Sequence, residues 1–247
     1  MVGQAHAKVF GIRKIFTRNQ DESTITLAEA ARCKFVFICL PTPVDKHGEY
    51  FVEDIKSIIK QIESYGAGSI YVIRSTVPPG FALGLQREMK IPRIVSNPEF
   101  LSETTAYEDT KNPPFVLIGG YEGQFVKEVQ GLYAARIKAP IIITDNTTAE
   151  LAKISLNAYF ATKVMFANQL HDATQKLNAN YSTIKHILES HPYGPKNHFT
   201  IWYKGKRGVH GMCLPKDSKA FAQYAHSELV EKVVELNRLY ETLKEND

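Results

Sequence analysis

The chain has 247 residues, of which 44% are hydrophobic and 23% charged, a composition that excludes a disordered or fibrous protein. The net charge is +4, and no block of Lys and Arg is interleaved with aromatic residues as a nucleic-acid groove requires. No apolar run approaches the roughly 18 residues that cross a bilayer, and three cysteines without a CxxC pair indicate neither a disulfide framework nor a zinc site.

The first 145 residues alternate short apolar runs with amphipathic stretches. The predicted strands, which are rich in Val, Ile and Phe, cover residues 13–17, 34–40, 69–73, 94–96, 115–119 and 141–144. The predicted helices between them cover residues 52–64, 80–88 and 122–135. Strands and helices that alternate in this way indicate a doubly wound, mostly parallel sheet.

After Asp145 the pattern becomes helical. Thr147 and Glu150 have the spacing of a capping box, and a stretch without Pro or Gly predicts one long helix over residues 149–177. Further helices are predicted over residues 181–189, 216–224 and 228–244, the last with Leu229, Val233, Leu236, Tyr240 and Leu243 on one stripe. We therefore expect an α/β protein with a Rossmann-like domain over residues 1–145 and an all-helical domain over residues 146–247.

Cys213 directly precedes the helix predicted from Lys216 onward. A thiolate at a helix N-terminus near cations has a lowered pKa and becomes a usable nucleophile. Such cations are present nearby in Lys204, Lys206, Arg207 and Lys216. The alternative is a buried structural cysteine, which is how we interpret Cys33 and Cys39. For Cys213 the nucleophile is the favoured interpretation.

Lys153 and Asn157 are four residues apart on the predicted long helix and therefore share one of its faces. A cation and an amide donor side by side suit a developing oxyanion. A snorkelling lysine beside a polar surface residue produces the same pattern. Taken alone, the pair favours that second interpretation.

Five segments stand in one order along the chain, with the sequences LPTP (residues 40–43), STVPPG (75–80), NPEFLSE (97–103), ELAKISLN (150–157) and CLPKD (213–217). In this order they resemble the UDP-glucose/GDP-mannose dehydrogenase family. The resemblance runs from about Phe35 to Asn237, which is most of the chain. It favours a functional role for Lys153 and Asn157.

The resemblance implies an NAD-dependent enzyme that oxidises the C6 alcohol of a nucleotide sugar to a carboxylate through a thioester. The catalytic residues that it implies are Cys213, Lys153, Asn157, Asp217, Glu99 and Thr76. Cys213 would capture the aldehyde intermediate, Lys153 and Asn157 would stabilise oxyanions, and the other three would position the hydrolytic water.

The resemblance also implies binding residues. Those expected at NAD are Gly3, Pro41, Thr42, Pro43, Ser75, Thr76, Glu103 and Lys216. Those expected at the nucleotide sugar are Glu99, Phe100, Leu101, Ser102, Glu103, Lys153, Asn157, Lys206, Arg207, Gly208 and Gly211. We also expect a homodimer through the long helix, and neither a membrane nor a nucleic acid as a partner. Because residues 1–10 lack a secretion signal, the expected compartment is a reducing cytoplasm.

The sequence departs from the family pattern at both ends. Met1 to Ala5 resemble the tail of the Gly-x-Gly-x-x-Gly turn, with Gly3 as its third glycine, so we expect the first strand and two glycines to be missing. Arg18 stands near the position of the expected acidic residue, which leaves NADP open beside NAD. The family's third domain is expected to be missing after Asp247, and His210 and Met212 stand where the family has small residues.

Two other functions remain open. The chain is alternatively a catalytically silent remnant that serves as a dimeric scaffold or binds a nucleotide sugar without oxidising it. A single-step beta-hydroxyacid dehydrogenase shares the two-domain plan, but it needs no cysteine, and the CLPKD segment argues against it. UDP-glucose and GDP-mannose both remain candidate substrates.

Overall fold

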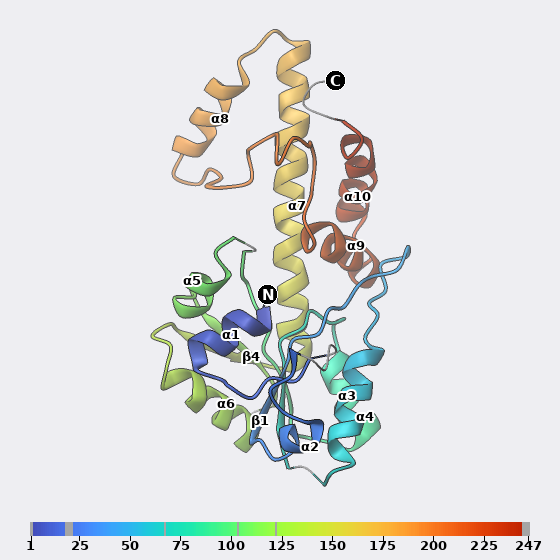
Figure 1. The fold of residues 1–247 in the computed structure, drawn as a ribbon. Coiled ribbons are helices and arrows are strands. Elements are labelled where there is room, and N and C mark those ends of the chain that lie inside the picture. Colours follow the sequence, from blue (N-terminus) through green and yellow to red (C-terminus); the bar gives the residue numbers. More distant parts are fainter. Residues whose placement is uncertain (1, 18–21, 67, 103, 122, 244–247) are drawn as a thin grey trace. The chain divides into compact units, whose positions relative to one another are not determined.

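The computed structural model describes residues 2–17, 22–66, 68–102, 104–121 and 123–243, and its elements are labelled in Figure 1. The chain divides into two compact units, and each is described by itself. Unit 1 comprises Met1–Pro43 and Tyr50–Lys153, and unit 2 comprises Val44–Glu49 and Ile154–Asp247. The long helix α7 (Asn146–Lys176) contributes its first residues to unit 1 and the others to unit 2.

Unit 1 is built on a five-stranded sheet of order β1-β2-β3-β4-β5. The strands are β1 (Phe35–Ile38), β2 (Ile70–Ile73), β3 (Ile94–Ser96), β4 (Val116–Gly119) and β5 (Ile141–Thr144). Neighbouring strands are parallel except β3 and β4, which pair in the antiparallel sense at Ser96 and Gly119. The predicted α/β class with a mostly parallel sheet is confirmed.

Helices cover both faces of this sheet (Figure 1). The helices of unit 1 besides the start of α7 are α1 (Val2–Phe10), α2 (Leu27–Ala30), α3 (Glu53–Glu63), α4 (Phe81–Met89), α5 (Ala106–Lys111) and α6 (Gln124–Ala134). Successive side chains of β2 point to opposite faces: Tyr71 and Ile73 pack in the core with α3 and α4, and Ile70 and Val72 pack in the core with α6. β2 is apolar without alternation because both of its faces are covered.

The predicted strand over residues 13–17 is wrong. This segment has no strand partner among the described residues, and its backbone bonds instead to a nearby turn. The Ile15 N–H donates to the Thr24 hydroxyl at 2.8 Å, and the Thr17 N–H donates to the Ser23 hydroxyl at 2.9 Å. Short hydroxyl side chains therefore satisfy the donors that a sheet would otherwise pair.

Unit 2 contains the rest of α7 together with α8 (Tyr181–Ser190), α9 (Leu214–Ala225) and α10 (Glu228–Tyr240). Ala161 and Met165 of α7 are buried in one core with Val233 and Tyr240 of α10. Among the described residues, no helix combines the length and apolar character that a membrane crossing needs.

The capping box predicted for α7 is wrong. The helix begins at Asn146, and the carboxylate of Asp145 caps it by accepting from the Thr148 N–H at 2.9 Å. Glu150, the predicted capping carboxylate, bonds to another part of unit 1 that is described below.

Candidate functional site

Two loops meet at the carboxyl edge of the sheet, where α/β folds bind ligands. Residues 40–43 follow β1, and residues 75–80 follow β2. The Ser75 hydroxyl donates to the Leu40 carbonyl at 2.7 Å, and the Thr42 hydroxyl donates to the Thr76 carbonyl at 2.6 Å. These bonds hold the predicted residues Thr42, Ser75 and Thr76 together.

The side chains of Lys153 and Glu99 form a buried ion pair in unit 1. The Lys153 ammonium lies 3.2 Å from the Glu99 carboxylate, and the two side chains are only 4% and 8% exposed. The second Glu99 oxygen accepts from the Leu101 N–H at 2.6 Å, so the carboxylate also orders the loop that follows β3. The ring of Phe100 lies 5.5 Å from the ammonium. An enclosed charge of this kind acts more strongly on a bound group than one in water.

Lys153 and Thr76 line one small cavity of about 10 Å³, together with Ser75, Ser96 and Glu150. That volume suits roughly one water molecule, and the lining is polar enough to bond one. The structure therefore brings together three of the predicted catalytic residues of unit 1: Thr76, Glu99 and Lys153.

Glu150 belongs to this cluster, although the sequence suggested only a helix cap. Its carboxylate accepts from the N–H groups of Gly80 at 2.7 Å and Ala82 at 3.0 Å, and from the Ser96 hydroxyl at 2.8 Å. It thereby caps α4 rather than its own helix. Burial raises the pKa of Glu150 to about 7 against the opposing effect of these bonds. In the sequence, the feature that places Glu150 near this cluster is its position one helical turn before Lys153.

In unit 2, the carboxylate of Asp217 lies between two donors. Asn157 of α7 donates to one oxygen at 2.6 Å, and the Lys216 ammonium lies 2.5 Å from the other. Asp217 is almost fully buried, whereas Lys216 is half-buried. This bond joins two of the predicted catalytic residues, Asn157 of the long helix and Asp217 of the CLPKD segment.

Cys213 is the N-cap residue of α9, and its carbonyl accepts from the Asp217 N–H at 2.9 Å. Its thiol therefore stands at the positive end of a twelve-residue helix, the position that was expected to favour a thiolate. Cys33, Cys39 and Cys213, which all lie in the described ranges, are thiols rather than disulfides. Burial raises the pKa of the Cys39 thiol, in keeping with a structural role for that residue.

The loop before Cys213 is tied to α10. Asn237 accepts from the Val209 N–H at 2.6 Å and donates to the Val209 carbonyl at 3.1 Å, as a neighbouring strand would. Gly208 has φ +87°, and an added Cβ would lie 2.5 Å from the Asn237 side-chain oxygen. Gly208, predicted at the sugar, therefore has a structural reason for being glycine, and Asn237 is a support that the sequence did not single out.

Arg207, predicted at the sugar, is buried and paired within unit 2. It donates to Asp172 at 2.7 Å and to Asn168 at 3.1 Å, and its guanidinium lies 4.8 Å from the Tyr240 ring. Lys206 is exposed at the end of a short turn that pairs it with Tyr203. Of this basic pair, Lys206 is the residue with an accessible ammonium.

The other predicted binding residues lie mostly at the surface. The exposed ones are Pro41, Pro43, Ser102 and Gly211. The Ser102 N–H donates to Asp109 at 2.9 Å, and the Phe100 ring packs edge-on against Phe115 at 5.0 Å. Glu103 lies outside the described residues.

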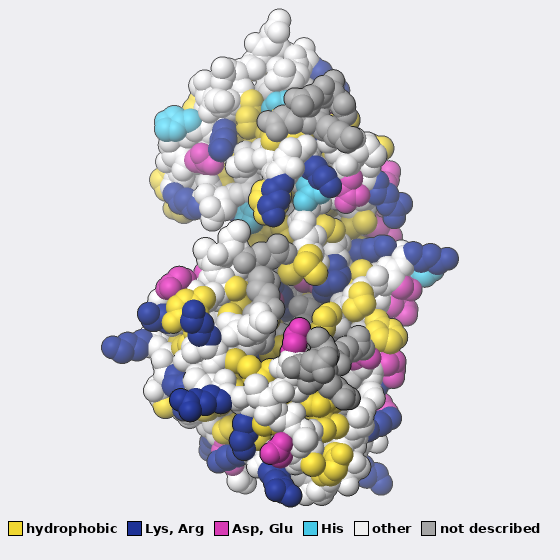
Figure 2. All heavy atoms as spheres, in the orientation of Figure 1, with side chains coloured by type: hydrophobic (Ala, Val, Ile, Leu, Met, Phe, Trp, Pro, Cys, Tyr) yellow, Lys and Arg dark blue, Asp and Glu magenta, His cyan; other side chains and the backbone are white. Residues whose placement is uncertain are grey.

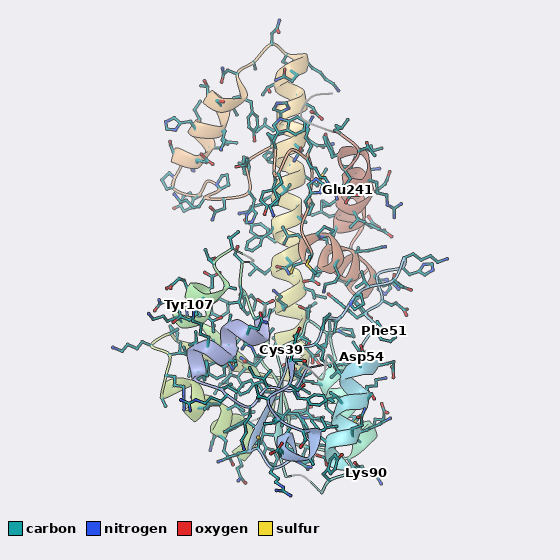
Figure 3. All side chains as sticks on the ribbon, in the orientation of Figure 1. Cys39, Phe51, Asp54, Lys90, Tyr107 and Glu241 are labelled. Carbon is teal, nitrogen blue, oxygen red and sulfur yellow. The ribbon has the colours of Figure 1, made fainter. Side chains whose placement is uncertain are left out.

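Gly3 fits the role expected of it at NAD. It lies in the first turn of α1, and an added Cβ would lie 3.2 Å from the Cys39 Cβ at the end of β1. Such close packing of helix on strand is the function of the third glycine in a dinucleotide-binding turn. With the Thr42 and Ser75 loops at the same sheet edge, the residues present fit this cofactor. Cys39 is labelled in Figure 3.

Comparison with known proteins agrees with this architecture. Residues 12–137 match the family model for the UDP-glucose/GDP-mannose dehydrogenase NAD binding domain, and residues 147–239 match the model for the central domain of that family. UDP-glucose 6-dehydrogenase TuaD of Bacillus subtilis is 31% identical over 217 residues, covering 82% of this chain and 46% of that protein. UDP-glucose 6-dehydrogenase of Campylobacter jejuni is 28% identical over 239 residues, covering 92% and 59%.

The chain thus spans about half the length of the curated relatives it matches. A UDP-glucose dehydrogenase structure from Pyrobaculum islandicum superposes with a TM-score of 0.75 over 95% of this chain and 60% of that one. At 24% identity this likeness shows the fold alone. The two family models cover most of the sequence in the predicted order. The chain therefore belongs to the UDP-glucose/GDP-mannose dehydrogenase family, and its first part is an NAD-binding domain.

Proposed function

We propose that this protein oxidises the C6 alcohol of a nucleotide sugar to a carboxylate through a thioester on Cys213. The observation that carries the proposal is the buried Asn157–Asp217 hydrogen bond beside the N-terminus of α9, where Cys213 stands. The relatives named above are UDP-glucose 6-dehydrogenases, so UDP-glucose is the first candidate substrate and GDP-mannose the second.

In this proposal, two molecules of NAD bound in succession would each accept one of the two hydrides that the oxidation releases. Gly3, Thr42 and Ser75 would hold each of them at the carboxyl edge of the sheet. Lys153 would stabilise the alkoxide as the alcohol loses its proton to a water.

The chain's own nucleophile acts in the second half of the reaction. The Cys213 sulfur adds to the aldehyde carbon and forms a thiohemiacetal, which keeps the aldehyde from escaping. This adduct then loses the second hydride together with its hydroxyl proton, which leaves a thioester. Water then attacks the thioester carbon, the carbon–sulfur bond breaks, the carboxylate leaves, and the thiol is regenerated.

The roles of the other residues follow from their contacts. Asn157 is oriented by Asp217 and would donate to the oxyanion of each tetrahedral adduct. Thr76 lines the one-water cavity with Lys153, and Glu99 is held against the ammonium, so these residues would position the hydrolytic water. Lys216 is paired with Asp217, which keeps a cation at the start of α9.

Cofactor stoichiometry tests the proposal. The chain incubated with UDP-glucose or GDP-mannose and NAD should yield two NADH per sugar, and Cys213→Ser should form no acid while still binding the nucleotide sugar. Cys33→Ser is the matched control and should keep both. Sugar binding without any NADH would indicate the silent scaffold instead, and undiminished acid formation by Cys213→Ser would remove the thioester from the mechanism.

We also propose that the chain forms a homodimer through α7. The side chains of Tyr159 and Phe166 are 58% and 57% exposed, and seven residues place them on one face of the helix. The small residues Ala158, Ala161 and Ala167 of α7 are at most 1% exposed, so they are not available for contact with a second copy. The aromatic face, not the small-residue face, therefore supports the proposal.

A further inference from the structure

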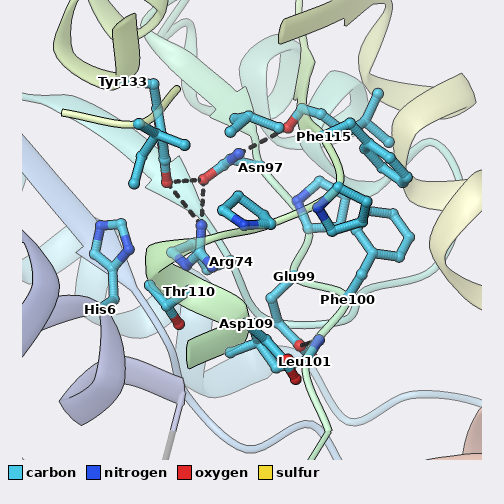
Figure 4. A pocket seen from close by; sticks show the side chains of 16 residues that line it. His6, Arg74, Asn97, Glu99, Phe100, Leu101, Asp109, Thr110, Phe115 and Tyr133 are labelled. Carbon is cyan, nitrogen blue, oxygen red and sulfur yellow. Dashed lines mark hydrogen bonds between the residues drawn. The ribbon is translucent and has the colours of Figure 1, made fainter. Parts of the chain in front are cut away.

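A pocket of about 40 Å³ lies in unit 1, apart from the small cavity beside Lys153 (Figure 4). Its polar lining includes His6 of α1, Arg74 after β2, Asn97 after β3 and Tyr133 of α6. Four separate segments of unit 1 therefore contribute polar side chains to one pocket.

Arg74 places a buried charge at this cavity. Its guanidinium donates to the side-chain oxygen of Asn97 at 2.5 Å and to the Tyr133 hydroxyl at 2.7 Å, and its Nε is buried without a partner. Arg74 is 6% exposed, and no carboxylate of the described residues forms an ion pair with it. A guanidinium removed from water without a counter-ion is costly, because neutral partners replace little of its hydration.

His6 adds an unused donor beside that charge. Its side chain is 1% exposed, and neither ring nitrogen has a hydrogen-bond partner. The ring stacks on Phe10 at 4.2 Å, which fixes its plane. A neutral imidazole carries one N–H and one acceptor nitrogen. Because neither nitrogen is bonded elsewhere, the tautomer whose N–H faces a bound group is available. Figure 4 shows the ring beside the hydrogen-bonded group of Arg74, Asn97 and Tyr133.

Two carboxylates also line the cavity, and both have partners of their own. Glu99 is paired with Lys153, and Asp109 accepts from the Ser102 N–H and the Thr105 hydroxyl. Neither compensates the guanidinium. The charge that the cavity lacks is therefore a negative one next to Arg74.

The volume of the cavity limits the size of the anion that can supply this negative charge. A single water needs about 10–15 Å³ on this measure, so about 40 Å³ accepts an ion of one to four heavy atoms and excludes a sugar or nucleotide. We propose that the cavity between His6 and Arg74 binds a small monovalent anion of the size of chloride, formate or nitrate.

The site lies under both catalytic loops of unit 1. Arg74 stands two residues before Thr76, and Asn97 stands two residues before Glu99. The Arg74–Asn97 bond joins the ends of β2 and β3, and an anion that satisfies the guanidinium would hold those ends in place. This inference does not depend on the proposed reaction.

Thermal unfolding of the full chain tests it. The protein is kept in sodium gluconate, whose anion is too large for the cavity, and the gluconate is replaced by chloride, formate or nitrate at constant ionic strength. We expect the unfolding midpoint to rise by about 2–4 °C as the site saturates. The rise should disappear in Arg74→Met, shrink in His6→Phe, and persist in Arg87→Met, a control on the exposed side of α4.

Crystals soaked in sodium bromide give a second measurement, which also serves if Arg74→Met fails to fold. An anomalous peak between the His6 ring and the Arg74 guanidinium is the expected result. An empty or water-filled cavity in bromide would overturn the proposal, as would equal midpoint shifts in the wild type and either cavity variant.

Discussion

The carboxylate of Asp217 is enclosed by donors from two helices of unit 2, Asn157 on α7 and Lys216 on α9. Hydrogen bonds to a charged group contribute about 1.5–3 kcal/mol, and a buried donor left without its acceptor costs a similar amount. Asp217 therefore supports the packing of α9 as well as the proposed chemistry.

Asp217→Asn should lower the free energy of unfolding by about 2 kcal/mol. The new amide cannot accept a charge-assisted bond from Lys216 and places its own N–H groups among existing donors. Urea denaturation followed by circular dichroism measures the change. Glu189→Gln, which removes a long surface ion pair with Lys185, should change the value by less than about 0.5 kcal/mol. Equal effects of the two variants would mean that the buried bond contributes little.

Glu150 makes the stability of unit 1 depend on pH. Its pKa is about 7 in the folded protein and 4.5 in the reference state. Between these values the folded state binds the proton more tightly than the unfolded chain does. The stability from this group is therefore fully present below pH 4.5 and is lost as the pH rises through 7, by about 3 kcal/mol in total.

Glu150→Gln should remove this loss, so the free energy of unfolding should fall less between pH 5 and pH 8 than in the wild type. Chemical denaturation at both pH values measures it, with Glu88→Gln on the exposed side of α4 as the control. The pKa shift of His6 has the opposite effect on the pH dependence of stability. Burial and Arg74 lower this pKa to about 2, so the stability that neutral His6 contributes is lost as the pH falls below 6.5. An unchanged pH dependence in Glu150→Gln would contradict the first effect.

At the scale of elements, the loop before α9 depends on close contact with α10. Gly208→Ala should destabilise the protein by 2 kcal/mol or more, because Gly208 has φ +87° and its new Cβ would lie 2.5 Å from the Asn237 oxygen. Gly84→Ala in α4, with nothing within 4 Å, should instead stabilise by about 0.5–1 kcal/mol. Thermal unfolding of both variants checks the difference in sign, and a stable Gly208→Ala would show that the loop has an alternative path.

Regular elements were predictable where apolar side chains alone decide the structure. Strands such as β2 follow from unbroken apolar runs, and α7 follows from a long stretch without Pro or Gly. The stripe predicted for α10 was partly wrong: Leu229 is 66% exposed, whereas Asn237 is 7% exposed. Periodicity counts apolar residues and does not detect an amide that pairs with a loop backbone.

In the candidate site, too, local features were predictable from the sequence and long-range contacts were not. The spacing of Lys153 and Asn157 and the position of Cys213 are local, so the sequence contains them directly. The partners of Glu150 are Gly80 and Ser96, which are 70 and 54 residues away. The cavity at His6 likewise combines side chains from four separate elements. Contacts of this kind arise from tertiary packing, and no local pattern predicts them.

At the scale of the whole molecule, 30 Lys and Arg residues nearly balance 26 Asp and Glu residues. On the described part of the face in Figure 2, Lys and Arg side chains are scattered among acidic and hydrophobic ones. A net charge of +4 over 247 residues agrees with this distribution. Recognition is therefore better sought in local sites and apolar surfaces than in a long-range field.

The exposed aromatic face of α7 provides the last prediction. Two large aromatic side chains on one helix face are typical of an interface, since burying them contributes far more than a scattered apolar residue does. The wild type should therefore elute as a dimer in size-exclusion chromatography with light scattering, and Tyr159→Glu with Phe166→Glu should elute as a monomer at the same concentration. Ile187→Glu changes an equally exposed side chain on α8 and should leave the dimer intact. A monomeric wild type would contradict the dimer. A double variant that remains dimeric would place the interface elsewhere, because carboxylates cannot be buried against their copies without strong repulsion.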